Sequence, residues 1–280
     1  MIEPELLMLA YRSGIFPMSD ARDDPEIFWI EPRLRAILPL DGFHLSHSLA
    51  RTLRRGRFAV TCNTAFSEVM DACAAPRQVR PESDDESGSW ISHRIQASYE
   101  NLHYLGQAHS IEVWQMDDSG ERTLVGGLYG VGFDRVFCGE SMFSRVADAS
   151  KVALAWLIAA MRLGGAALLD CQFMTPHLAS MGAVEMPQKR YLSLLRQAQS
   201  SSQQSSSEQS SGHSSAAGCE GVETAAGAAL GTETGSAGAA SAAAVLALPE
   251  AFAGLLERAV DSGMASSPGK FIAQFLTQTS

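Results

Sequence analysis

The 280-residue chain lacks an apolar run long enough to cross a bilayer. Residues 1–18 also lack the basic start and the small-residue cleavage site of a signal peptide, so we expect neither a membrane span nor export. The five cysteines are an odd number without any Cys-x-x-Cys pair, which argues against a disulfide framework and against a zinc knuckle. Together these absences predict a soluble protein of the reducing cytoplasm.

The chain also lacks metal-ligand spacing and a basic net charge. His44 and His47 lie on one predicted helix without a third ligand nearby, so we expect no metal site. The formal net charge of −10 argues against general nucleic-acid binding, although half of the excess negative charge follows Ala198. One short basic segment either binds phosphate groups or forms a solvated helix face, and it holds Arg51, Arg54, Arg55 and Arg57.

Hydrophobic residues make up 46% of the chain, which is enough for a sizeable core, but they are unevenly distributed. Residues 199–244 are mainly Ser, Gln, Gly and Ala, and they predict a disordered linker because they bury too little apolar surface to offset their ordering entropy. Residues 245–280 form a C-terminal tail in which apolar residues recur at near-helical spacing between Val245 and Val260. This tail either docks on the core or stays mobile.

Before the linker, helical and extended patterns alternate as in an α+β protein. Gly56 and Gly106 follow predicted helices, whereas Ser92 and Asp148 precede them as candidate caps. We expect helices over residues 4–13, 44–55, 66–75, 93–105 and 151–163, and extended segments over 28–39, 58–62, 110–114, 124–131, 136–138 and 166–170. The order of strands, then helix, then strand is that of an acetyltransferase-like core.

Polar residues lie at the C-terminal end of the last of these strands, a usual place for ligand contacts in α/β sheets. Alternation along the strand puts Asp170 and Gln172 on one face and Cys171 on the other. Asp170 either takes part in catalysis or caps the turn at residues 175–176. Cys171 is a candidate nucleophile, but no His flanks it, and a buried thiol is the simpler interpretation.

Two motifs, FCGESMFSR and LLDCQFMTPHLASMG, bracket the helix over residues 151–163. Others precede them in order: AYRSGIFPM at residues 10–18, FHLSHSLARTLRRGRFAVT from Phe43, SWIS from Ser89 and LVGGLYGV from Leu124. From Tyr11 to Leu195 the chain resembles the bacterial leucyl/phenylalanyl-tRNA–protein transferase family. The resemblance implies a small N-terminal domain over residues 1–42 and an acetyltransferase-like (GNAT-type) catalytic domain over residues 43–198.

The activity that the resemblance implies is transfer of leucine or phenylalanine, and also methionine, from aminoacyl-tRNA to the N-terminal Arg or Lys of a protein. The new peptide bond marks that protein for degradation, and neither cofactor nor metal takes part. By this resemblance Gln172 orients the attacking amine or polarises the ester carbonyl, because a neutral amide hardly binds a proton. Asp170 would hold that amide through a side-chain hydrogen bond and receive the proton.

Glu140, beside Gly139, would meet the positive charge of the acceptor, with a salt bridge to Arg145 or Lys151 as the alternative. Trp29 and Trp90 would stack on the terminal adenosine of the tRNA. The resemblance also implies an apolar pocket for the donor side chain, lined by Leu128, Met142, Leu154, Leu157, Met161 and Leu169. On spacing alone Leu154, Leu157 and Met161 are ordinary core positions of a helix. Family members often carry aromatic residues where this chain has Leu157 and Met161.

Two other functions stay open at this point. A CoA-dependent N-acetyltransferase would need a glycine-rich turn for the pyrophosphate, and SRVADASK before Val152 contains no glycine. A non-catalytic tRNA-binding protein would not need Asp170 and Gln172 on one face of a strand end.

Overall fold

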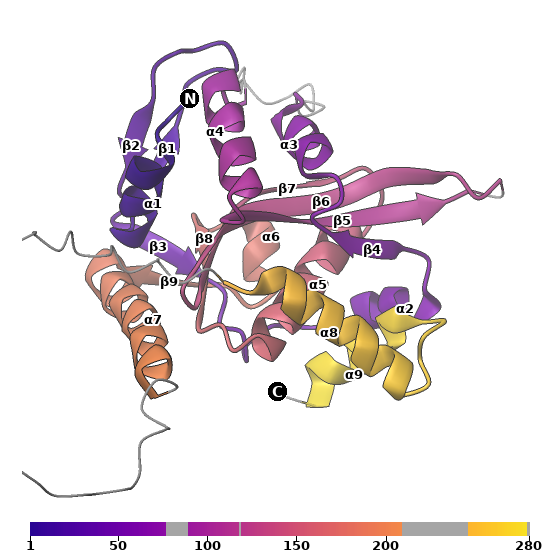
Figure 1. The fold of residues 1–280 in the computed structure, drawn as a ribbon. Helices are drawn as coiled ribbons and strands as arrows, with labels where there is room; N and C mark the ends of the chain where they lie inside the picture. The colour runs from indigo at the N-terminus through magenta and orange to yellow at the C-terminus, as the bar shows by residue number, and fades with distance from the viewer. Residues whose placement is uncertain (77–88, 118, 209–245, 279–280) are drawn as a thin grey trace, which may run out of the picture.

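The computed structural model describes residues 1–76, 89–117, 119–208 and 246–278. Its centre is a seven-stranded sheet in the order β4-β5-β6-β7-β8-β3-β9 (Figure 1). These strands are β3 (Leu34–Ile37), β4 (Ala59–Cys62), β5 (Ala108–Met116), β6 (Arg122–Phe133), β7 (Val136–Ser144), β8 (Leu168–Gln172) and β9 (Val184–Pro187). Neighbouring strands run antiparallel, except that β7 and β8 are parallel and are joined by helix α5 (Ala149–Leu163). The described chain is therefore an α+β protein, as the sequence predicts.

Helices cover both faces of this sheet, and each face carries its own apolar cluster. The first cluster joins the sheet to α5, and it includes residues of α2 (His47–Arg55), α6 (Pro176–Ala179), α8 (Leu248–Asp261) and α9 (Pro268–Gln278). The second joins the opposite face to α1 (Pro4–Arg12), α3 (Phe66–Ala74), α4 (His93–Tyr104) and α7 (Gln188–Glu208). Successive strand residues alternate between the clusters: Leu169 and Cys171 belong to the first, and Leu168 to the second.

Local capping signals account for several helix ends. The Ser46 hydroxyl accepts from the backbone N–H of Leu49 at the start of α2, and Gly56 ends that helix in the left-handed conformation at φ 61°. The Ser92 hydroxyl caps α4 in the same way. Asp148 precedes α5 as expected, but its side chain accepts from Thr52 at 3.1 Å and caps no N–H of the helix.

The C-terminal tail docks on the core, which decides between the two alternatives for this segment. Phe252 of α8 packs against Trp156 of α5 in a tilted arrangement with ring centroids 5.1 Å apart, and Leu255 and Ile272 are fully buried. Helix α5 is thus covered on one side by the sheet and on the other by α8 (Figure 1). This explains why α5 is apolar around almost its whole circumference.

The N-terminal segment is tied closely to the seven-stranded sheet. Strands β1 (Phe16–Met18) and β2 (Phe28–Ile30) form a separate hairpin-like pair, whereas β3 lies inside the main sheet between β8 and β9. Helix α7 continues through Glu208, past the residue at which we expect the linker to begin, and the Gln199 amide donates to the Arg12 carbonyl. The rest of the predicted linker and the charged segment of residues 80–88 lie outside the described residues. Among the described helices, none is long and apolar enough to span a membrane.

Candidate active site

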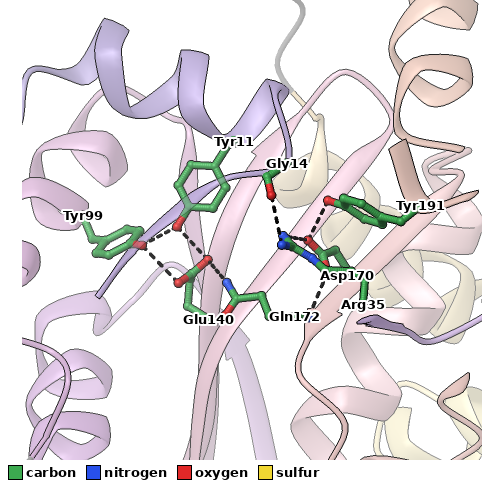
Figure 2. A network of polar contacts seen from close by, with 8 residues as sticks. All are labelled: Tyr11, Gly14, Arg35, Tyr99, Glu140, Asp170, Gln172 and Tyr191. Atoms are coloured by element: carbon green, nitrogen blue, oxygen red, sulfur yellow. Dashed lines mark hydrogen bonds and ion pairs between the residues drawn. The ribbon is translucent and has the colours of Figure 1, made fainter. Parts of the chain in front are cut away.

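Glu140 lies at a break in the pairing of β6 and β7. Tyr129 pairs with Ser141 and Gly130 pairs with Gly139, so Glu140 is the extra residue of a β-bulge. Only glycine fits at position 130, because a Cβ there would lie 2.2 Å from the Cys138 carbonyl oxygen. The bulge turns the Glu140 side chain toward the face that carries α1 and α4 (Figure 2).

Three side chains donate to the Glu140 carboxylate (Figure 2). The Tyr11 hydroxyl and the Gln172 amide each lie 2.7 Å from Oε1, and the Tyr99 hydroxyl lies 3.0 Å from Oε2. The Tyr11 and Tyr99 hydroxyls also contact each other. Burial raises the pKa of Glu140 to about 7, although the three hydrogen bonds oppose that rise. The carboxyl group can therefore change its charge near neutral pH.

Gln172 ends β8 in a conformation that non-glycine residues rarely adopt, with φ at 61°. Its backbone N–H donates to Asp170 Oδ1 at 2.9 Å, and its side-chain amide group is directed at Glu140. Because a carboxylate accepts, the amide nitrogen must face Glu140 and the amide oxygen must face away. Among the described residues no group donates to that oxygen, so it is available to accept a hydrogen bond from a substrate.

Asp170 is fully buried and is held by four hydrogen bonds. Arg35 donates to both carboxylate oxygens, from Nε at 2.9 Å and from Nη2 at 2.6 Å. The Tyr191 hydroxyl donates at 2.8 Å, and the Gln172 backbone N–H is the fourth donor. Arg35 also donates to the Gly14 carbonyl and lies over the rings of Phe16 and Tyr191. Burial works against the cation, but the hydrogen bonds and charge of Asp170 raise the pKa of Arg35 above its usual value, so this is a buried ion pair.

The structure corrects three of the contacts expected from the sequence. The side-chain hydrogen bond between Asp170 and Gln172 is wrong, because each side chain has other partners and only the backbone of Gln172 contacts Asp170. Asp170 does not cap the following turn, since Thr175 caps α6 with its own hydroxyl. Glu140 pairs with neither of the two cations named above: Arg145 donates to the Leu124 carbonyl and Lys151 lies 3.8 Å from Asp148.

Sequence reasoning missed four residues that build this site, namely Tyr11, Arg35, Tyr99 and Tyr191. A signal existed for Arg35, which stands as a lone charge in the apolar stretch RAIL of an extended segment. A charge in such a place requires a buried partner. The tyrosines carry no comparable signal, because a tyrosine in a helix is usually an ordinary core residue.

The predicted pocket residues lie on the other side of the sheet, in the first apolar cluster. Five are buried, and Met142 is partly buried against them. A cavity of about 570 Å³ lies at the start of β8, and none of the six residues lines it. Cys171 also packs against the first cluster, and burial raises the pKa of its thiol, which disfavours the thiolate nucleophile. Among the described residues, no three metal-ligating side chains gather.

The candidate tRNA contacts fall on two separate surfaces. Trp29 of β2 is 43% exposed, and Trp90 is partly buried against the second cluster. The four arginines are exposed and lie on or just after α2, which packs on the opposite face of the sheet. A tRNA that contacts both surfaces must pass around an edge of the sheet.

Comparisons with known proteins point to a single family. The family model described as leucyl/phenylalanyl-tRNA protein transferase matches residues 37–196, and the model of its N-terminal domain matches residues 1–33. A leucyl/phenylalanyl-tRNA–protein transferase of Novosphingobium aromaticivorans is 60% identical over 280 residues, which cover 100% of this chain and 97% of that protein. One of Zymomonas mobilis is 54% identical over 72% of this chain and 71% of that protein.

Among solved structures, that of L-PGS from Bacillus licheniformis matches with a TM-score of 0.31 and 13% identity, over 63% of this chain and 55% of that chain, which is too slight a likeness to support an argument. The sequence matches are much stronger than this structural match, since one of them is 60% identical and spans the whole chain. The chain therefore belongs to the leucyl/phenylalanyl-tRNA protein transferase family.

Proposed function

We propose that the protein transfers leucine or phenylalanine, and also methionine, from aminoacyl-tRNA to the N-terminal Arg or Lys of other proteins. The observation that carries this proposal is the contact between Gln172 and Glu140, at 2.7 Å, in a chain of this family. It places an open amide oxygen beside a carboxyl group that can be charged near neutral pH. Such a pair suits a cationic amine that has to be bound, oriented and deprotonated.

The reaction makes modest chemical demands. The aminoacyl ester is already reactive, and an α-amine with a pKa of about 8 is partly neutral near pH 7. The enzyme therefore has to position the amine against the ester carbonyl and exclude competing water. Because the amide nitrogen of Gln172 is used by Glu140, its oxygen is left to orient the amine through an N–H, and polarising the carbonyl is the less suitable role.

In this proposal the buried pair of Arg35 and Asp170 acts on Gln172 and not on the substrate. Asp170 accepts from the Gln172 backbone N–H, and it thereby fixes the left-handed conformation that directs the amide at Glu140. The Glu140 carboxylate draws the cationic N-terminus of the acceptor toward this amide.

The remaining parts of the proposal concern the donor and the fold. We place the donor side chain against the apolar residues named above, the terminal adenosine on Trp29 and Trp90, and acceptor-stem phosphates on the arginines of α2. The antiparallel run of β5, β6 and β7, followed by α5 and the parallel strand β8, supports an acetyltransferase-like core. A tRNA-dependent reaction also supports a cytoplasmic location.

The test is transfer of labelled leucine from Leu-tRNA to a peptide with an N-terminal Arg, without CoA or added metal. The matched control is the same peptide with an acetylated N-terminus, which offers no amine and should stay unlabelled. Product that requires acetyl-CoA would support an acetyltransferase instead. Binding of Leu-tRNA without any transfer would support the non-catalytic alternative.

A further inference from the structure

Glu140, Tyr11 and Tyr99 form a closed ring of oxygen contacts (Figure 2). Each tyrosine contacts one carboxylate oxygen, at 2.7 and 3.0 Å, and the two phenol oxygens contact each other. Each of the three contacts needs one proton to be a hydrogen bond. The two phenols bring two protons, so an ionised Glu140 leaves one contact without a proton, whereas a protonated Glu140 supplies the third.

The surroundings of the ring allow Glu140 to take up and release this proton. Tyr11 and Tyr99 are fully buried, whereas Glu140 keeps partial exposure and so can exchange a proton with a bound group. Among the described residues, no cation forms an ion pair with Glu140. The titratable groups that face it are Tyr11 of α1, Tyr99 of α4, Tyr129 of β6, Cys138 of β7 and Asp170 of β8.

We propose that Glu140 is the proton acceptor of the transfer reaction, and that Tyr11 and Tyr99 are positioning residues. Both phenols donate to the ionised carboxylate before transfer, and one of them turns its O–H to the other phenol once Glu140 holds the proton. This inference rests on the proposed function. The lone pair of the acceptor amine forms the new C–N bond, and the ester C–O bond breaks with its electrons on the ribose oxygen. The proton lost by nitrogen passes to Glu140 and from there to the ribose oxygen, which leaves as a hydroxyl.

The other two polar residues of the site are less suited to take this proton. All four donors around Asp170 point at its two oxygens, and its side chain is 0% exposed. Gln172 is a neutral amide. By contrast, Glu140 has a pKa of about 7, close to that of an α-amine, so the proton passes between groups of similar affinity.

The test is the pH profile of kcat/KM for leucyl transfer to an N-terminal Arg peptide by the full-length chain. Tyr11→Phe and Tyr99→Phe each remove one donor that lowers the pKa of Glu140, so the acid limb should move to higher pH by about one unit. The rate should recover at high pH, which a merely structural role would not produce. Glu140→Gln should lower the rate at pH 8 by about a hundredfold. The acceptor amine titrates in the same range, but its pKa is the same for every variant.

Tyr129→Phe is the matched control. Its ring packs edge-to-face on Tyr99 with centroids 5.6 Å apart, and its buried hydroxyl has no hydrogen-bond partner among the described residues. Its acid limb should stay in place. The proposal is overturned if the limb stays in place in the Tyr11 and Tyr99 variants, if it moves equally in Tyr129→Phe, or if Glu140→Gln keeps the wild-type rate. If only one of the variants Tyr11→Phe and Tyr99→Phe folds, that variant is sufficient for the test. Absence of leucylated peptide from the wild type at every pH would instead overturn the proposed function.

Discussion

Replacement of Asp170 by Asn should destabilise the protein strongly, although it changes few atoms. Asn keeps an oxygen for the Gln172 backbone N–H and for Arg35 Nε, but its amide nitrogen would face Arg35 Nη2, which is also a donor. The side chains of Arg35 and Asp170 are 2% and 0% exposed, so the remaining guanidinium would be a buried charge without a counter-ion. Breaking such a pair costs about 3–5 kcal/mol. For a chain of this size the melting temperature should fall by roughly 6–20 °C.

The assay is urea unfolding of Asp170→Asn, Arg35→Met and the double variant. If the two charges stabilise each other, the double variant should lose less than the sum of the single losses, by at least about 2 kcal/mol. Lys151→Met is the control, because its ion pair with Asp148 is partly exposed and has a contact distance of 3.8 Å, so its loss should stay under about 1 kcal/mol. Additive losses, or a loss in Asp170→Asn no larger than in the control, would refute this account of the pair.

Three further predictions follow from particular contacts. Gln172→Glu should lower the transfer rate by about a hundredfold, because a second carboxylate would face Glu140 at the present 2.7 Å contact; near-full activity would contradict the amide's orienting role. Leu255→Ala should cost about 2–5 kcal/mol in thermal or urea unfolding, whereas Leu256→Ala, at a site 37% exposed, should cost far less; equal losses would contradict docking of α8. Joint replacement of Arg51, Arg54 and Arg55 by Ala should weaken tRNA binding and flatten its salt dependence by up to about one unit of slope per lost contact. An unchanged slope would indicate that these arginines form a solvated helix face.

Local signals predicted most elements of the fold. Ser92 and Gly56 act at helix ends as their residue types suggest, because a cap depends on a few neighbouring backbone groups. The helix over residues 151–163 also carries a signal for the placement of the C-terminal tail. Its apolar residues surround the axis, and such a helix must be covered on both sides. The sheet covers one side, so docking of the C-terminal tail on the other could have been inferred.

Contacts between distant residues could not be read from the sequence. Arg35 and Asp170 are 135 positions apart, and nothing local specifies that they meet. The bulge at Glu140 depends on the register of β6 against β7, which strand alternation does not reveal. Gly130 is the one visible trace of it, since glycine inside a strand often marks a bulge or a close backbone approach.

Both polar side chains that face each other in the site stand at irregular backbone positions. Glu140 is the extra residue of a bulge, and Gln172 has a positive φ at a second register shift, where β3 pairs with β8. Irregular conformations of this kind persist only when the surroundings fix them. The surroundings here are the ring of tyrosines for Glu140 and the buried ion pair for Gln172. Asp170 therefore need not touch the substrate to matter for transfer, because loss of its hydrogen bond to the Gln172 backbone would release the amide from Glu140.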